Sequence, residues 1–185
     1  MNVPAIILDC DLRSQSGIIQ PLGRNKIPII AISSKKDCPA FYSRYVKKKY
    51  ISPAIEDGEK GYIYFLLNLN IGGVLFYSND VSASLISKHK EALQNKDYLI
   101  NIPDHNILEK MFDKWECYKI ASALNIPMPK TELITTKEDI YNVWNNFNKP
   151  VILKGTRLAG GMYKKIYNPS EIPYHWNSMC ELVND

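Results

Sequence analysis

The chain has 185 residues, of which 45% are hydrophobic and 23% charged, with a formal net charge of +4. These values are ordinary for a folded globular protein, so they exclude a disordered or fibrous chain. The four cysteines and three histidines are scattered without metal-ligand spacing, so neither a zinc site nor a disulfide framework is expected. The length suits one large domain or one and a half ordinary ones, because compact domains commonly have about 100 to 150 residues.

The amino terminus, MNVPAIILDCD, has no basic flank and only a short apolar run. This excludes a signal peptide and a membrane span, and favours a cytoplasmic protein. Residues 43–50, SRYVKKKY, place four cations among aromatic residues. Such a pattern occurs at nucleic-acid surfaces, but a solvated edge or loop explains a short charge run more often. We therefore expect neither nucleic acid nor membrane as a partner.

Strand-like and helix-like segments alternate over the first hundred residues. The strand candidates are 4–9, 26–34, 74–80 and 98–103, and the helix candidates between them are 16–25, with Pro21 in its first turn, a segment from 58 closed by Gly72 and Gly73, and 81–93. Alternation of this kind is typical of a parallel α/β sheet. We predict a Rossmann-like domain over residues 1–103.

The pattern changes from Asp104 onward. Apolar positions at helical spacing over 104–125 indicate one helix, or two with a break near Asp113, followed by a proline-rich extended segment leading into a strand. An amphipathic helix (137–147), strands at 151–153 and 164–168, and a helix from Ser170 complete a second unit, 104–185. A sheet with so few strands is not stable alone. We therefore expect that either the chain continues or another subunit completes the fold.

The stretch KPVILKGTRLAGG, 149–161, ends a buried strand in a cation, Lys154. The carboxyl ends of strands are where open α/β proteins bind ligands, and an ammonium group there suits a polyphosphate. The glycines that follow let backbone N–H groups approach phosphate oxygens, with Arg157, Lys164 and Lys165 adding positive charge.

Lys154 also has an ordinary structural explanation. It could extend into solvent from a strand end beside a simple glycine hairpin, because neither the Walker sequence nor G-x-G-x-x-G is present. Lys114, on an amphipathic helix, could equally be a solvated residue, and Asp113 before it suits a helix cap.

Two segments in order, DKWECYKIASALNIPMPKT (113–131) and KPVILKGTRLAGG (149–161), resemble the ATP-grasp superfamily. Members have an Asp-Lys that opens a helix, a "GIPxP"-like turn, and a strand that delivers a second lysine before a glycine-rich loop. The preceding residues, including SGIIQPLGRNKIPIIAIS and CPAFYSRY, look like the pre-ATP-grasp domain of carboxylate–amine ligases related to D-aspartate ligase and the carbamoyl-phosphate synthase large chain.

The resemblance implies a nucleotide site. Lys114 and Lys154 match the lysines that bind ATP phosphates, Ile152 matches an apolar position that packs on adenine, and Gly160 and Gly161 match the loop that covers the phosphates. The Mg²⁺ ligands of the family are expected beyond residue 185, so no residue here is assigned to catalysis or to a metal, and this chain alone should be inactive.

The resemblance also implies substrates. Members convert a carboxylate to an acyl phosphate with ATP, and an amine then displaces phosphate. The first domain would offer substrate contacts through Arg13 and Ser14 after its first strand and Asp80 after its third, although such loop residues, together with Gly17, also serve as ordinary helix caps. Other partners would be a carboxyl-terminal half or a second subunit, with a homodimer left open. The alternative is a non-catalytic Rossmann-like subunit that binds a nucleotide or metabolite.

Overall fold

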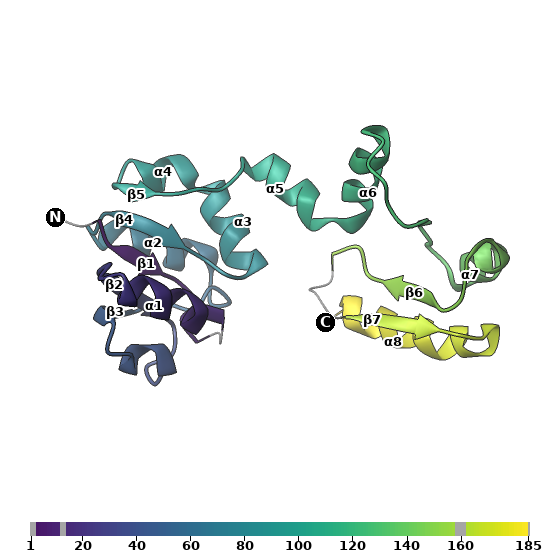
Figure 1. Ribbon diagram of the computed structural model, residues 1–185, viewed down its shortest axis with the longest axis horizontal. Helices are drawn as coiled ribbons and strands as arrows, with labels where there is room; N and C mark the ends of the chain where they lie inside the picture. The colour runs from purple at the N-terminus through teal and green to yellow at the C-terminus, as the bar shows by residue number, and fades with distance from the viewer. Residues whose placement is uncertain (1–2, 12–13, 158–161, 185) are drawn as a thin grey trace. The chain divides into compact units, whose positions relative to one another are not determined.

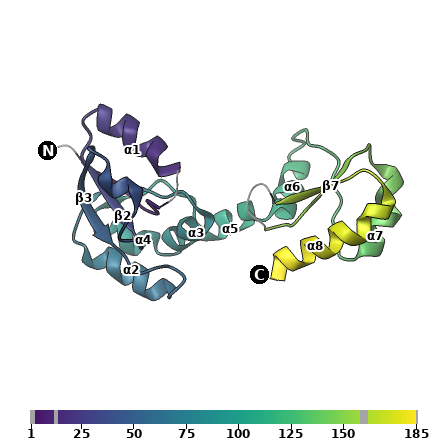
Figure 2. The same ribbon diagram turned by 90° about the horizontal axis from the view of Figure 1, so that it is seen from below.

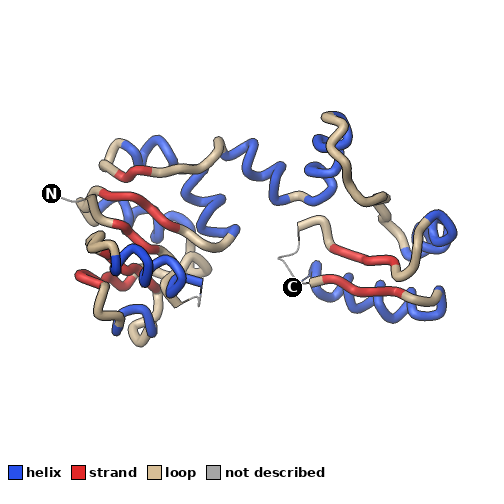
Figure 3. The backbone as a smooth tube through the Cα atoms, in the orientation of Figure 1, coloured by secondary structure: helices blue, strands red, loops and turns tan. Residues whose placement is uncertain are grey.

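The computed structural model describes residues 3–11, 14–157 and 162–184. The chain divides into two compact units, Met1–Leu108 and Glu109–Asp185, called here the first and the second unit (Figure 1). The first holds a five-stranded parallel sheet and the second a two-stranded antiparallel one (Figure 3). The predicted α/β fold class is confirmed. No helix in the described ranges is long and apolar enough to cross a membrane.

The sheet of the first unit has the strand order β3-β2-β1-β4-β5, all neighbours running parallel. Its elements are β1 (Ala5–Ile7), α1 (Ser14–Arg24), β2 (Ile29–Ser33), the 3₁₀ turn η1 (Pro39–Tyr42), β3 (Val46–Ile51), α2 (Glu59–Asn68), β4 (Gly73–Phe76), α3 (Asp80–Lys88), α4 (Lys90–Gln94) and β5 (Tyr98–Leu99). Strands β2 and β3 are added on one side of β1, and β4 and β5 on its other side, so the strand order switches between β1 and β4. In open sheets of this kind, ligands bind beyond the carboxyl ends of the strands at such a point.

Two apolar clusters cover the two faces of this sheet. On one face, Ile6 and Leu75 of the strands pack with residues of α2, α3 and α4. On the other, Ile7 and Ile29 pack with Ile19 of α1 and with η1. Figure 2 shows α1 on one side of the strands and α2 on the other. Burial on both faces explains why β1 and β2 are continuous apolar runs.

The lysine-rich segment forms an edge strand, β3, which the sequence did not predict as a strand. Its three lysines, 47–49, are exposed, in agreement with the interpretation as a solvated edge. Lysines on an edge strand discourage pairing with other chains.

Several predicted helix boundaries are wrong. Gly72 and Gly73 do not close α2, which ends at Asn68. Asn70 takes the left-handed conformation there (φ 47°), as Asn can in place of Gly, and Gly73 belongs to β4. Helix α1 begins at Ser14, so Pro21 lies inside it rather than in its first turn.

The remaining corrections in the first unit concern a helix and a strand. The predicted helix 81–93 is divided at His89 into α3 and α4, because the backbone at His89 leaves the helical region (φ −111°). Only Tyr98 and Leu99 of the predicted last strand pair with β4.

The second unit is built on a hairpin. Its elements, with α5 spanning the division, are α5 (His105–Phe112), α6 (Lys114–Ala123), α7 (Lys137–Val143), η2 (Trp144–Asn146), β6 (Val151–Lys154), β7 (Tyr163–Ile166), η3 (Pro169–Glu171) and α8 (Ile172–Asn184). Of the two alternatives for 104–125, the structure has two helices, with the break at Asp113. The predicted strand after the prolines is wrong, since 126–136 form no strand. With Pro127 and Pro129 lacking N–H groups, this segment cannot supply a full ladder.

Candidate nucleotide site

The hairpin of β6 and β7 has one covered and one open face. Leu153 and Ile166 are buried in a cluster with residues of α7, η2 and α8. Ile152, 49% exposed, and Lys154, also exposed, alternate with Leu153 along β6. Because successive side chains of a strand point to opposite faces, these two residues share the face that α7 and α8 do not cover.

The antiparallel register extends this open face to β7. Ile152 pairs with Lys165, and Lys154 pairs with Tyr163, which is 44% exposed. The face therefore combines apolar surface with two ammonium groups. A flat apolar ligand attached to a polyanion fits such a surface, because the apolar part is removed from water while the anion meets the cations. Lys164, by contrast, pairs with Leu153 on the covered face and is half-buried.

Asp113 caps helix α6, as predicted. Its backbone is extended (φ −91°, ψ 113°), and its carboxylate accepts hydrogen bonds from the N–H groups of Trp115 (2.9 Å) and Glu116 (3.1 Å). The N–H of Lys114 donates to the carbonyl oxygen of Thr156 at 2.8 Å. The amide donors of the first helical turn are thus already occupied. An anion at this end of α6 would have to be bound by side chains rather than by the helix terminus.

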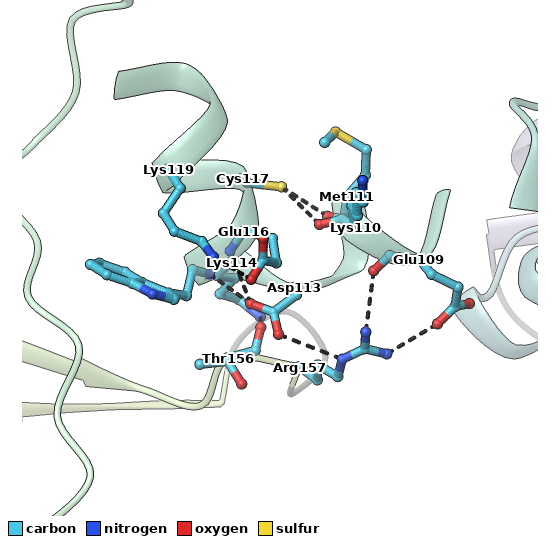
Figure 4. A network of polar contacts seen from close by, with 11 residues as sticks. Glu109, Lys110, Met111, Asp113, Lys114, Glu116, Cys117, Lys119, Thr156 and Arg157 are labelled. Carbon is cyan, nitrogen blue, oxygen red and sulfur yellow. Dashed lines mark hydrogen bonds and ion pairs between the residues drawn. The ribbon is translucent and has the colours of Figure 1, made fainter. Parts of the chain in front are cut away.

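Lys114 lies against the loop that follows Lys154. Besides its backbone contact, its ammonium group is 3.5 Å from the Thr156 carbonyl oxygen, and Thr156 follows Lys154 by two residues (Figure 4). The structure therefore brings the helix that begins with Lys114 to the end of the strand that carries Lys154. Lys114 and Thr156, which are 42 residues apart in the sequence, are joined by this backbone hydrogen bond and by the contact of the ammonium group.

Arg157 does not have the role that its sequence position suggested. Its guanidinium donates to the carboxylate of Glu109 at 3.0 Å, and its Nε lies 3.6 Å from the carboxylate of Asp113 (Figure 4). The hydrogen bond to Glu109 raises the pKa of the guanidinium. Arg157 is therefore occupied by two carboxylates, and it is not an additional cation for the glycine-rich loop.

The other predicted site residues are placed as follows. Gly160, Gly161 and Arg13 lie outside the described residues. Ser14 is the first residue of α1. Asp80 is the exposed first residue of α3, but the cap is one residue earlier: the side chain of Asn79 accepts from the N–H of Ser82 at 2.7 Å.

A polar cluster lies at the carboxyl ends of β1 and β4, beside the loops that the sequence analysis assigned to substrate, but its residues Asp9, Gln15, Ser78 and Ser82 were not assigned there. Asp9, in the left-handed region (φ 52°), accepts a hydrogen bond from the hydroxyl of Ser82 at 2.7 Å, and burial raises the pKa of its carboxyl group. The amide nitrogen of the fully buried Gln15 donates to the hydroxyl of Ser78. The other Gln15 amide atom, Oε1, has no hydrogen-bond partner among the described residues. The same signal that pointed to Arg13, Ser14 and Asp80, polar residues directly after two parallel strands, also applies to Asp9 and Ser78.

Metal ligands are not gathered in the described part of the chain. No three or more His, Cys, Asp or Glu side chains within 3–11, 14–157 and 162–184 are grouped so that they could hold an ion. Of the residues that the sequence assigned to a nucleotide, Ile152 and Lys154 lie on the open hairpin face, and Lys114 contacts the loop that follows it.

No protein-family model and no curated protein matches the sequence. Solved structures do. The biotin carboxylase domain of Hydrogenobacter thermophilus 2-oxoglutarate carboxylase is 14% identical, with a TM-score of 0.69 over 97% of this chain and 41% of that one. An L-amino acid ligase from Bacillus licheniformis is 13% identical (TM-score 0.68, 98% of this chain, 42% of that one). N5-carboxyaminoimidazole synthetase from Staphylococcus aureus is 15% identical (TM-score 0.66, 98% and 47%).

This chain spans less than half the length of each of these structures. At such low identity the likeness shows the fold alone. It extends over nearly the whole chain, so it includes both the parallel sheet and the hairpin unit. The resemblance drawn from the motifs is therefore confirmed for the fold: nearly the whole chain has the fold of a part, less than half, of each of these structures.

Proposed function

We propose that this chain is the amino-terminal part of an ATP-dependent carboxylate–amine ligase and provides one wall of its nucleotide site. The observation that carries the proposal is the open face of the β6–β7 hairpin. Ile152 and Lys154 are neighbours on this face, and Lys114 contacts the loop that follows β6. The two structural units would keep the roles expected from the motifs, a pre-ATP-grasp domain and the first part of the grasp.

The residues on this face fit ATP. The exposed side chain of Ile152 would cover one face of the adenine ring, which removes apolar surface of both from water. Lys154 and Lys114 would hold the phosphates by their ammonium groups, since the amide donors at the start of α6 are occupied. Gly160 and Gly161 would close over the phosphates.

Two similar structures support the choice of ligand. The 2-oxoglutarate carboxylase domain was crystallised with MgADP, ADP and bicarbonate, and an S. aureus N5-carboxyaminoimidazole synthetase with ADP. We extend to this chain the use of ATP with Mg²⁺. Because no metal-ligand group is formed by the described residues, the Mg²⁺ ligands would come from sequence beyond residue 185 or from a partner subunit.

The chemistry assigned to such a site needs positioning and charge neutralisation rather than a nucleophilic side chain. ATP would supply the phosphoryl group that turns the substrate carboxylate into an acyl phosphate, and an amine would then displace phosphate. The part of this chain is to hold the triphosphate and offset its charge through Lys114 and Lys154. This explains a site composed of cations and small residues.

Small-molecule carboxylate and amine substrates would be contacted by the first unit, at the carboxyl ends of its strands. Arg13, Ser14 and Asp80 all follow β1 or β4, and a guanidinium at Arg13 suits a carboxylate. A kinship with D-aspartate ligase and the carbamoyl-phosphate synthase large chain and a cytoplasmic location complete the proposal, which leaves open whether the chain forms a homodimer.

One observation favours a second function, a nucleotide- or metabolite-binding subunit without catalysis. The buried Gln15 has an amide oxygen with no partner among the described residues, beside the end of β4 where parallel sheets bind ligands. In this case the ligand would occupy the first unit and the hairpin would be structural.

Nuclear magnetic resonance can distinguish the two functions. We expect MgATP, titrated into the ¹⁵N-labelled chain, to shift the amide signals of Ile152, Lys154 and Lys114, because their surroundings change on binding. Binding should be weak, since this chain provides one wall of the site. Shifts confined to the ends of β1 and β4 would favour the second function, and the absence of shifts at millimolar nucleotide would contradict the ligase proposal.

A further inference from the structure

Arg157 and Thr156 connect the loop after β6 to the junction of α5 and α6. The guanidinium of Arg157 reaches the carboxylate of Glu109 at 3.0 Å, its backbone oxygen at 3.4 Å and the carboxylate of Asp113 at 3.6 Å. Thr156 accepts the N–H of Lys114 at 2.8 Å. Two consecutive residues, which follow Lys154 after Gly155, are therefore docked on the same junction (Figure 4).

This docking sets the spacing between the two lysines assigned to ATP. Lys154 is three residues before Arg157 in a strand end, and Lys114 directly follows Asp113, which Arg157 contacts. One carboxylate oxygen of Asp113 caps α6 while the other faces Arg157. The helix start and the strand end are thus connected by the Arg157 side chain as well as by the Lys114–Thr156 hydrogen bond, because a planar guanidinium can meet two carboxylates at once.

We propose that Arg157 is a positioning residue: by bridging Glu109 and Asp113 it holds Lys154 and Lys114 at the separation that a triphosphate requires, and it does not itself contact phosphate. The inference rests on the proposed ATP site. Two carboxylates offset the charge of the guanidinium, so an approaching anion meets a neutralised group rather than a free cation. Phosphate binding is left to the lysines.

A direct role and a positioning role of Arg157 predict opposite changes in ATP affinity when Glu109 is replaced. If Arg157 bound phosphate directly, Glu109→Gln would release the guanidinium and remove a nearby negative charge, so ATP would bind as tightly or more tightly. If Arg157 acts through the bridge, Glu109→Gln breaks it and ATP binds more weakly, although the site has become more positive. The sign of this change decides between the two roles.

The experiment is a double-mutant cycle on the 185-residue chain, with MgATP affinity measured by ¹⁵N shift titration. We expect Arg157→Gln and Glu109→Gln each to weaken binding about fivefold, and the double variant to be no weaker than either, because both remove the same bridge. Arg157→Lys should not restore binding, since an ammonium cannot bridge two carboxylates as a planar fork can. Unchanged or tighter binding by Glu109→Gln, or full rescue by Arg157→Lys, overturns the inference.

A second measurement separates failure of this inference from failure of the ATP site. The amide hydrogen of Lys114 is bonded to the carbonyl oxygen of Thr156. Without nucleotide, it should exchange with solvent about fivefold faster in Arg157→Gln or Glu109→Gln than in wild type, and the double variant should show the same rate as the single variants. If wild type does not bind ATP, the proposed function fails, and hydrogen exchange at Lys114 is then the test of the Arg157 bridge. Unchanged exchange at Lys114 in Arg157→Gln overturns the bridge whatever ATP does.

Discussion

Gly73→Ala is expected to destabilise the first unit by about 2 to 4 kcal/mol. Gly73 has a φ of +156°, which side-chain-bearing residues rarely adopt, and an added Cβ would lie 2.5 Å from the backbone oxygen of Pro4. That oxygen accepts the N–H of Val74 at 2.9 Å, so it cannot retreat without loss of a hydrogen bond between β4 and the segment before β1. Urea denaturation followed by circular dichroism measures the change.

The matched control is Gly17→Ala in helix α1. An added Cβ there meets no atom within 4 Å, and alanine is the better helix former by up to about 1 kcal/mol. We expect this variant to be as stable as wild type or more stable. Equal effects of the two substitutions would mean that the close approach of Gly73 to Pro4 does not constrain the sheet.

Lys154→Met is expected to weaken MgATP binding by about 10- to 100-fold, because it removes a hydrogen bond to a charged group worth about 1.5 to 3 kcal/mol. Methionine keeps the length and the apolar stem of the side chain, and Lys154 is exposed in β6, so folding should be unaffected. Isothermal titration or shift titration gives the affinity, and thermal unfolding checks the fold.

Lys48→Met provides the control for charge. Lys48 is also an exposed lysine in a strand, β3 of the first unit, and its loss changes the net charge of the chain by the same amount. Its substitution should leave ATP affinity within about twofold of wild type, because Lys48 is not part of the proposed site and an exposed charge that does not contact the ligand is screened by salt. Equal losses from Lys48→Met and Lys154→Met would indicate an unspecific electrostatic effect and no local site.

Local sequence signals predicted the features that depend on neighbouring residues. The cap role of Asp113 was predicted from its residue type, and a break at this position was one of the two alternatives considered for 104–125. The strand ending in Lys154 was anticipated from three apolar residues between Pro150 and a glycine loop. In both cases the deciding contacts lie within a few positions along the chain.

Features that depend on distant contacts were not predicted. Gly72 and Gly73 resemble a helix stop, yet Gly73 is required by the approach of Pro4, which the local pattern does not reveal. Arg157 resembles a phosphate ligand, yet its partner Glu109 is 48 residues away. Which face of the hairpin stays open is decided by the packing of α7 and α8 against Leu153, and no pattern within the strand itself specifies that.

The central claim is that the phosphates of ATP are held by the ammonium groups of Lys114 and Lys154. Its most direct test compares the affinities of ATP and AMP for wild type and for the double variant Lys114→Met/Lys154→Met. We predict that wild type prefers ATP, and that in the variant ATP affinity falls to that of AMP while AMP affinity is nearly unchanged. A preference for ATP that survives the loss of both lysines, or an equal loss for AMP, would contradict the claim.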